Sequence, residues 1–521
     1  MQSPLSSGNV KVFAALTLFA SILLLFISPD SYTHDVFERV DSACFFTGGK
    51  AWMNGMVPYV DFTDSKGPLL WLIYGIGYLL SHYNYIGVFW ISCLWYGCTF
   101  YLTYLTFGIF LSDKKQCLLG TAVMCLAFFM PVMHYEVRAE DFCQPFIMLS
   151  LYHTARMLYG KERYQTAKAV NNSFFALGLS FAALVLIKFS IAAMQSAFIL
   201  YAFYHLIRSK RSIIIPFCAS AAGAFALCLP FLVYFLITGS LTAFIQEYFL
   251  NTLQTVSPQQ SFLGAYYDEC MDAWTNYPVV FVMLTLLIVG CVAIMPRLGK
   301  YRLFPLFTTL FFFALAMKHH GLVHYFSAVA FGLTFLVAAV LQWLRPKVSR
   351  AGLAISFLCL MVLCTFGAQI KRTEFHVYFW ENDVRRKVYY DMACLISQVE
   401  KAGVFNAWGC GNGIETLPDA LPGSKHWIYQ LGSTEEMHDA HVEELCSRQP
   451  DFVFLRSEES ILRLGMTLQS LDSIGYHCCY DWATRGVRHY LYTKHDVKLP
   501  AQSVTPSDWD ILLKRKPFSG R

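Results

Sequence analysis

The sequence predicts an α-helical polytopic membrane protein with a small C-terminal α/β domain. Of its 521 residues, 56% are hydrophobic and 14% are charged, whereas about a quarter of the residues of a soluble domain are charged. The mean hydropathy is +0.44. A soluble chain could not bury so much apolar surface. This composition therefore excludes a cytosolic enzyme, a nucleic-acid-binding protein and a disordered scaffold.

Hydropathy predicts about eleven transmembrane spans, since about 20 apolar residues are needed to cross a bilayer. The first span is kept as a helix because no small-residue cleavage site precedes Pro29. Segment 69–81 is apolar but short, and it is predicted to be an interfacial helix. The spans are expected near residues 12–28, 86–111, 117–133, 142–159, 173–188, 190–207, 213–237, 278–294, 303–317, 323–343 and 351–369.

Basic residues in five alternate, short connections predict the orientation. By the positive-inside rule these connections are cytoplasmic. The long loop 29–85, the loop 238–277 and the tail beyond residue 370 then lie on the outer face, which is the periplasm if the membrane is a bacterial inner membrane. The basic residues are Lys114 and Lys115; Arg156, Lys161, Arg163 and Lys168; Arg208, Lys210 and Arg211; Arg297, Lys300 and Arg302; and Arg345, Lys347 and Arg350.

The tail is predicted to be a separate domain. Residues 1–370 form the membrane domain, and 371–521 form an extracytoplasmic domain in which helical and strand patterns alternate, as in an α/β fold. The run Gly409 to Gly413 is interpreted as a turn, because its spacing does not fit a dinucleotide-binding loop. The expected elements are helices near 388–402 and 457–474 and strands near 405–409, 451–455 and 489–494.

The first outer loop carries the strongest candidate site. Asp41 opens a short predicted helix that runs to Met53 and is closed by Gly55. Asp41 is the candidate general base, with helix capping as the alternative. Lys66 is a candidate phosphate contact, and the alternative is that it pairs with Asp64 to steady the loop.

Further ionisable residues recur at predicted outer membrane exits, where polar residues are functional suspects. Arg138, Lys188 and His324 are candidate phosphate contacts, with local pairing or snorkelling as the alternatives. Glu140 and Asp141 are candidates for orienting the acceptor or binding a divalent cation. Zinc is disfavoured: the 17 cysteines are scattered, and adjacent His319 and His320 would point apart on a helix.

These residue types fit one kind of chemistry. A carboxylate on an outer loop can take a proton from an acceptor hydroxyl or amine. Cations at the membrane surface can stabilise a lipid phosphate whose charge grows as its bond to a sugar breaks. The pattern therefore favours an enzyme with a lipid-phosphate donor, and no soluble nucleotide sugar is required.

The sequence resembles the C-type glycosyltransferases that use polyprenyl-phosphate sugars, which include protein-mannosyltransferase, aminoarabinose-transferase and bacterial lipopolysaccharide-sugar transferase branches. The resemblance rests on Asp41-Ser42, on Gly55 with Pro58-Tyr59, and on Lys66-Gly67-Pro68-Leu69-Leu70. It implies that Asp41 is the catalytic carboxylate and Lys66 a donor-phosphate contact. Asp-Ser replaces the Asp-Glu pair common in several branches, which leaves the branch and the metal requirement open.

The resemblance also implies where the later candidates belong. Arg138, Glu140 and Asp141 fall where the family has a second acidic outer turn, and His324-Tyr325 resembles its outer His-Tyr element. Asp35 is a rival to Asp41 as the catalytic carboxylate.

We therefore expect a multi-pass inner-membrane enzyme that moves a sugar from a polyprenyl phosphate to a glycan, lipid or protein acceptor on the periplasmic face. Two alternatives stay open. A polymerase or ligase that uses diphosphate-linked oligosaccharides would be expected to carry its key basic residues in later outer loops. A lipid or glycan transporter would be expected to show inverted repeats or broken helices near the midplane.

Overall fold

The computed structural model describes most of the chain, which forms two compact units. Unit 1 comprises 1–28, 92–233 and 258–371, and unit 2 comprises 29–91, 234–257 and 372–521. The described residues are 7–28, 31, 40–82, 84–129, 138–253, 262–276, 278–317, 323–379, 382–407, 414–417, 419–428, 435–456, 462, 465–484 and 487–499.

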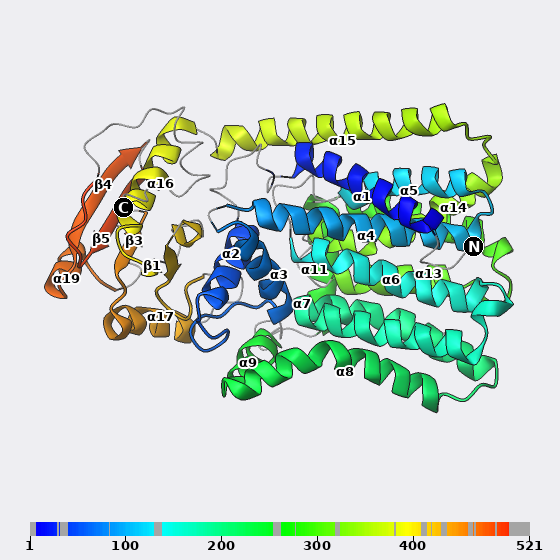
Figure 1. Cartoon of the computed structure of the whole chain (residues 1–521), viewed down its shortest axis with the longest axis horizontal. Helices are drawn as coiled ribbons and strands as arrows, with labels where there is room; N and C mark the ends of the chain where they lie inside the picture. Colours follow the sequence, from blue (N-terminus) through cyan, green and yellow to red (C-terminus); the bar gives the residue numbers. More distant parts are fainter. Residues whose placement is uncertain are drawn as a thin grey trace. The chain divides into compact units, whose positions relative to one another are not determined.

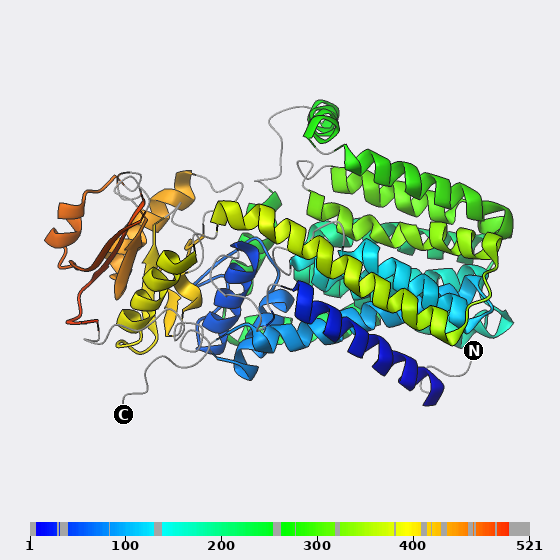
Figure 2. The same ribbon diagram turned by 90° about the horizontal axis from the view of Figure 1, so that it is seen from above.

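Unit 1 is a bundle of long apolar helices that run alongside one another (Figures 1 and 2). Six of the described helices are long and apolar enough to cross a membrane. Many large apolar side chains are exposed, because lipid is their expected solvent. The helices of the bundle are α1 (Ser7–Ile27), α4 (Ile86–Phe110), α5 (Lys114–Phe129), α6 (Ala139–Tyr159), α7 (Ala167–Arg208), α8 (Ile214–Ile237), α12 (Val279–Ile294), α13 (Phe304–Met317), α14 (Leu333–Leu344) and α15 (Arg350–Phe379). Helix α11 (Phe262–Asn276) belongs to the same unit but contains three acidic residues.

Helix α7 contains two spans that were predicted separately. Lys188 has non-helical backbone angles, with φ −157° and ψ 99°. The two halves of α7 fold back on each other: the Phe174 and Phe203 rings lie 5.0 Å apart, and Gln195 donates a hydrogen bond to the Leu177 carbonyl at 3.2 Å. A continuous helix would separate these residues by many turns. Lys188 therefore marks the hairpin between two antiparallel helices.

Several of the predicted cytoplasmic connections meet at one end of unit 1. Arg211 donates to the Gln165 carbonyl at 2.7 Å, which links the connections before and after α7. The Tyr159 hydroxyl donates to the Tyr301 carbonyl at 2.8 Å, which links the end of α6 to the connection before α13. This arrangement agrees with the basic connections facing one side, and the assignment of that side to the cytoplasm stays a prediction.

Unit 2 contains the described part of the first long loop. Helices α2 (Val40–Met53) and α3 (Pro68–Leu80) lie side by side (Figure 1). Their close approach depends on Gly49, where a Cβ atom would lie only 2.4 Å from the Gly75 backbone nitrogen. The same unit holds the short helix α9 (Leu241–Phe244) and a π-helical turn, η2 (Ile245–Asn251).

The rest of unit 2 is the C-terminal α/β domain. Its five-stranded sheet has the order β2-β1-β3-β5-β4, with β1 parallel to β2 and β3 and with the other pairs antiparallel. Helices α16 (Asn382–Ile396) and α17 (Glu435–Arg448) pack on the sheet, and α19 (Leu468–Ser473) is short. The strands are β1 (Ala402–Asn406), β2 (Ala420–Pro422), β3 (Phe452–Leu455), β4 (His477–Thr484) and β5 (Val487–Thr493).

The predicted fold class, a helical polytopic membrane protein with a small C-terminal α/β domain, is confirmed. In the interval predicted as one helix over 457–474, the described helical residues are Leu462 and those of α19, with a turn at Gly465 before α19. The glycine-rich run 409–413 lies outside the described residues.

Candidate active site

Helix α2 places Asp41 in its first turn, where a carboxylate interacts favourably with the helix dipole. The helix ends at Met53, and Gly55 follows with φ +98°, a backbone conformation that glycine adopts without strain. The predicted helix from Asp41 to Met53 is therefore present. Asp41 is half-buried, so its side chain remains partly accessible.

Three charged residues of the first long loop act electrostatically on the buried thiol of Cys44, three positions after Asp41. Burial raises the pKa of the Cys44 thiol well above its usual value, and the carboxylates of Asp64 and Asp41 raise it further, whereas the Lys66 ammonium lowers it. All three charged groups therefore lie close enough to this face of α2 to act on Cys44 electrostatically. The loop brings the candidate base and the candidate phosphate contact to one region of unit 2.

Lys66 is held by its own loop. Its ammonium lies 3.8 Å from Oδ1 of Asp64 and 5.8 Å from the centroid of the Phe45 ring, and its side chain is 17% exposed. The Lys66 carbonyl accepts a hydrogen bond from the Tyr59 hydroxyl at 3.0 Å. Tyr59 is buried and has φ +69°, a strained value for a residue with a side chain. The Pro-Tyr element therefore fixes the backbone of Lys66. The ion pair between Lys66 and Asp64, the alternative role of Lys66 considered from the sequence, is present.

Lys50 is a buried residue of α2 whose partners the sequence did not indicate. Its ammonium donates to the carbonyl oxygens of Glu415 at 2.6 Å and Leu417 at 2.8 Å, both in the C-terminal domain. Burial lowers the pKa of Lys50 to about 7, an effect that Asp419 and Glu415 partly offset. This contact attaches the helix that carries Asp41 to the C-terminal domain.

The buried carboxyl group of Glu415 predicts a dependence of stability on pH. Burial raises the pKa of Glu415 from 4.5 to about 8. Between these two pKa values, the Glu415 carboxyl group is ionised in the unfolded chain but still protonated in the folded chain. The free energy of unfolding of the wild type therefore falls as the pH rises. Glutamine cannot ionise, so as the pH rises the free energy of unfolding of Glu415→Gln should increase relative to that of the wild type, by up to about 1.4 kcal/mol per pH unit.

Unfolding of the full chain at pH 5 and at pH 7.5 would measure the effect of Glu415→Gln. Glu400→Gln, at an exposed carboxyl group of the same domain, is the matched control. A difference between Glu415→Gln and wild type that does not change with pH would contradict a buried, protonated Glu415.

A second cluster of charged residues lies in unit 1, at the hairpin of α7. The Lys188 ammonium pairs with Oε1 of Glu140 and lies 3.9 Å from the centroid of the Tyr325 ring. The side chains of Lys188 and Glu140 are 11% and 2% exposed. The alternative that Lys188 merely snorkels to solvent does not describe this geometry, because its charge is paired inside the bundle.

Asp141 takes part in the first turn of α6. Its Oδ2 accepts a hydrogen bond from the Arg138 backbone N–H at 2.8 Å, and its Oδ1 accepts one from the Tyr96 hydroxyl at 2.7 Å. Asp141 thus caps the helix and ties it to α4. The roles predicted for Arg138, Glu140 and Asp141 stay predictions.

Some residues singled out from the sequence fall outside the described part of the chain: Asp35, His319 and His320, together with the side chain of His324. Among the residues that the structure describes, no group of three or more His, Cys, Asp or Glu side chains is arranged to hold a metal ion. A divalent cation at Glu140 and Asp141 stays a prediction.

Comparison with solved structures gives the fold. The crystal structure of ArnT from Cupriavidus metallidurans bound to undecaprenyl phosphate matches 95% of this chain and 100% of its own, with a TM-score of 0.59 and 11% identity. The apo structure of the same ArnT matches 94% of this chain and 98% of its own, with a TM-score of 0.56 and 12% identity. The chain has the C-type glycosyltransferase fold. No protein-family model and no curated protein sequence matches the chain.

Proposed function

We propose that the protein is a membrane glycosyltransferase that moves a sugar from a polyprenyl-phosphate donor to a glycan, lipid or protein acceptor on the periplasmic face of an inner membrane. One observation carries the proposal: almost the whole chain shares its fold with ArnT, whose structure contains undecaprenyl phosphate. The charged first long loop supports it, because Asp41 and Lys66 of that loop both act electrostatically on the same buried thiol, Cys44.

In the proposed reaction, Asp41 removes the proton from an acceptor hydroxyl or amine as the acceptor atom attacks the anomeric carbon of the donor sugar. A bond forms between the acceptor and the anomeric carbon, and the bond from that carbon to the phosphate oxygen breaks. The polyprenyl phosphate leaves with the bonding electron pair, and Asp41 releases its proton to solvent.

Lys66 is proposed to stabilise the charge that grows on the departing phosphate. Its ammonium lies 3.8 Å from Oδ1 of Asp64, and the Lys66 side chain is the more exposed of the two, at 17% against 4%, so a phosphate can reach the ammonium. Arg138, Lys188 and His324 are proposed for the same task on the strength of the sequence pattern.

Lys66→Met tests this assignment through binding. Loss of one charge-assisted contact is worth about 1.5–3 kcal/mol, so undecaprenyl phosphate should bind about ten- to a hundredfold more weakly. Binding of the labelled lipid to the protein in nanodiscs measures the effect.

The matched control for Lys66→Met is Lys494→Met, since Lys494 is a half-buried lysine of the C-terminal domain whose ammonium donates to Oε1 of Gln449 at 2.9 Å. Equal binding by wild type and Lys66→Met would remove Lys66 from the phosphate site. Tighter binding of undecaprenyl diphosphate than of the monophosphate by wild type would favour an enzyme that uses diphosphate-linked donors.

A further inference from the structure

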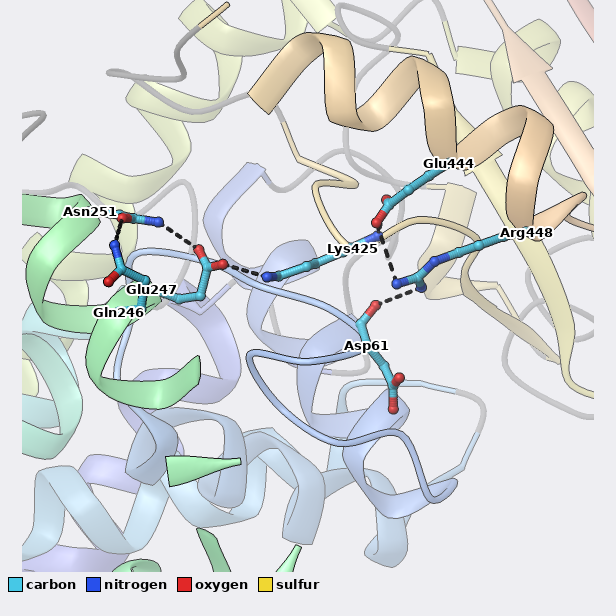
Figure 3. Close-up of polar contacts among 7 residues, drawn as sticks. All are labelled: Asp61, Gln246, Glu247, Asn251, Lys425, Glu444 and Arg448. Atoms are coloured by element: carbon cyan, nitrogen blue, oxygen red, sulfur yellow. Dashed lines mark hydrogen bonds and ion pairs between the residues drawn. The ribbon is translucent and has the colours of Figure 1, made fainter. Parts of the chain in front are cut away.

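Two segments of the chain far apart in sequence meet the C-terminal domain through alternating charges. Oε1 of Glu247, in the π-helical turn η2, pairs with the Lys425 ammonium. The Lys425 backbone N–H donates to Oε2 of Glu444 at 2.5 Å. Oε1 of Glu444 lies 3.3 Å from Nη2 of Arg448, whose Nη1 donates to the Asp61 carbonyl at 3.0 Å. Figure 3 shows these contacts, and we call Glu247, Lys425, Glu444 and Arg448 the charge clamp.

The charge clamp contacts the loop that precedes Lys66. The Thr63 backbone N–H donates to the Lys425 carbonyl at 3.0 Å. Lys425 therefore binds this loop through its main chain, while its side chain pairs with Glu247. Thr63 adjoins Asp64, the partner of Lys66. The C-terminal domain therefore contacts the first long loop on both sides of Phe62, within five residues of Lys66.

The central pair of the clamp is largely shielded from water. The side chains of Glu247 and Lys425 are 9% and 22% exposed. Oε2 of Glu247 also accepts a hydrogen bond from the Asn251 side chain at 2.9 Å, which holds the carboxylate in place (Figure 3). A buried charge that loses its partner is strongly destabilising, whereas removal of both charges costs much less. The Glu247–Lys425 pair therefore holds the 241–253 segment to the C-terminal domain.

We infer that Lys425 and Glu247 are positioning residues: through them the C-terminal domain holds the 56–66 loop, and with it Lys66, in the geometry that binds the donor phosphate. The inference rests on the proposed function and goes beyond it, because it gives the C-terminal domain and the 241–253 segment a role in donor binding. Asp41 has a separate attachment through Lys50 on α2. Loss of the clamp should therefore affect donor binding more than the chemical step.

The test is a double-mutant cycle with Lys425→Met, Glu247→Gln and the double variant in the full chain. Two quantities are measured: hydrogen–deuterium exchange in peptides covering 56–66 and 241–253, and kcat and KM for a polyprenyl-phosphate sugar. Each single variant should show faster exchange in both peptides and a KM for the donor raised about tenfold, with kcat changed less. The double variant should show changes in exchange and in donor KM no larger than those of the more affected single variant, because the effects of substituting two residues in contact are not additive.

The matched control removes an ion pair between two neighbouring strands of the sheet. Arg488 and Asp481 pair across the β4–β5 hairpin, so Arg488→Met with Asp481→Asn should leave both peptides and the donor KM unchanged. Lys425→Arg, which keeps the charge, should behave like wild type. If Lys425→Met does not fold, Arg448→Met removes the more exposed contact to Asp61 and applies the same test to the 56–66 peptide.

Two outcomes would overturn the inference. Unchanged exchange in the 56–66 peptide would show that the clamp does not hold this loop. Faster exchange with an unchanged donor KM would show a structural contact with no positioning role. A wild-type protein that turns over no polyprenyl-phosphate sugar would overturn the proposed function instead, and the exchange data would still decide whether the clamp holds the loop.

Discussion

Asp41→Asn is expected to reduce sugar transfer by a factor of about 10² to 10⁴, the usual contribution of a general base. Asparagine has nearly the same shape but cannot accept the acceptor proton, so the loss should appear in kcat. Asp41 is half-buried in the first turn of α2, and the substitution should leave the unfolding temperature close to that of wild type. Initial rates with protein in proteoliposomes, together with thermal unfolding, would measure both effects.

The control for Asp41→Asn is Asp113→Asn, which makes the same substitution at the start of another helix. The Asp113 side chain accepts a hydrogen bond from the Lys115 backbone N–H at the start of α5. That variant should retain wild-type turnover. If Asp41→Asn is as active as wild type, Asp41 has no part in the reaction. The rival carboxylate Asp35, which lies outside the described residues, would then be the next to substitute.

Lys188→Met is expected to destabilise the protein by about 3–5 kcal/mol, because it removes the ammonium that pairs with the buried Glu140 carboxylate. Both side chains of this pair are nearly inaccessible, so solvent cannot replace the lost partner. The double variant Lys188→Met/Glu140→Gln should recover most of the loss, since it removes both charges. Reversible unfolding in mixed micelles would compare the variants with wild type.

The double variant also separates folding from donor binding. If Lys188 contacts the donor phosphate, Lys188→Met/Glu140→Gln should fold but bind undecaprenyl phosphate more weakly. Wild-type lipid affinity in the folded double variant would assign the pair a purely structural role. A Lys188→Met variant as stable as wild type would contradict the buried ion pair itself.

Local sequence signals predicted the elements that place the candidate site. Gly55 indicated the end of α2, because only glycine adopts φ +98° without strain. The hydropathy of 173–188 and 190–207 predicted two spans with almost no loop between them, and the structure has a hairpin at Lys188. These features depend on residues close together in the chain, so the sequence contains the information needed.

Pairings between distant residues could not be predicted in this way. The sequence drew attention to Glu140 and to Lys188 but not to their contact across 48 positions. Glu247 lies in the π-helical turn η2 and Lys425 in a connection of the C-terminal domain, 178 positions apart, and nothing in the sequence around either residue marks them as partners.

Several elements of the C-terminal domain also lacked a clear sequence signal. Strand β2 has only three residues, and a bulge between Cys478 and Tyr480 interrupts the pattern of β4. Helix α17 has few apolar residues, of which Leu445 is fully buried, so its periodicity is weak. Burial in the finished sheet, rather than local pattern, stabilises these elements.

The most direct test of the proposed function is the fate of a labelled polyprenyl-phosphate sugar pool from the native host. The pool would be incubated with the purified wild-type protein and with Asp41→Asn, both in the presence of an extract of native acceptors. We predict that wild type releases the label from the lipid, leaves polyprenyl phosphate behind and labels an acceptor, while Asp41→Asn does so at least about a hundredfold more slowly. Label that stays on the monophosphate lipid with folded wild-type protein would contradict the proposed function.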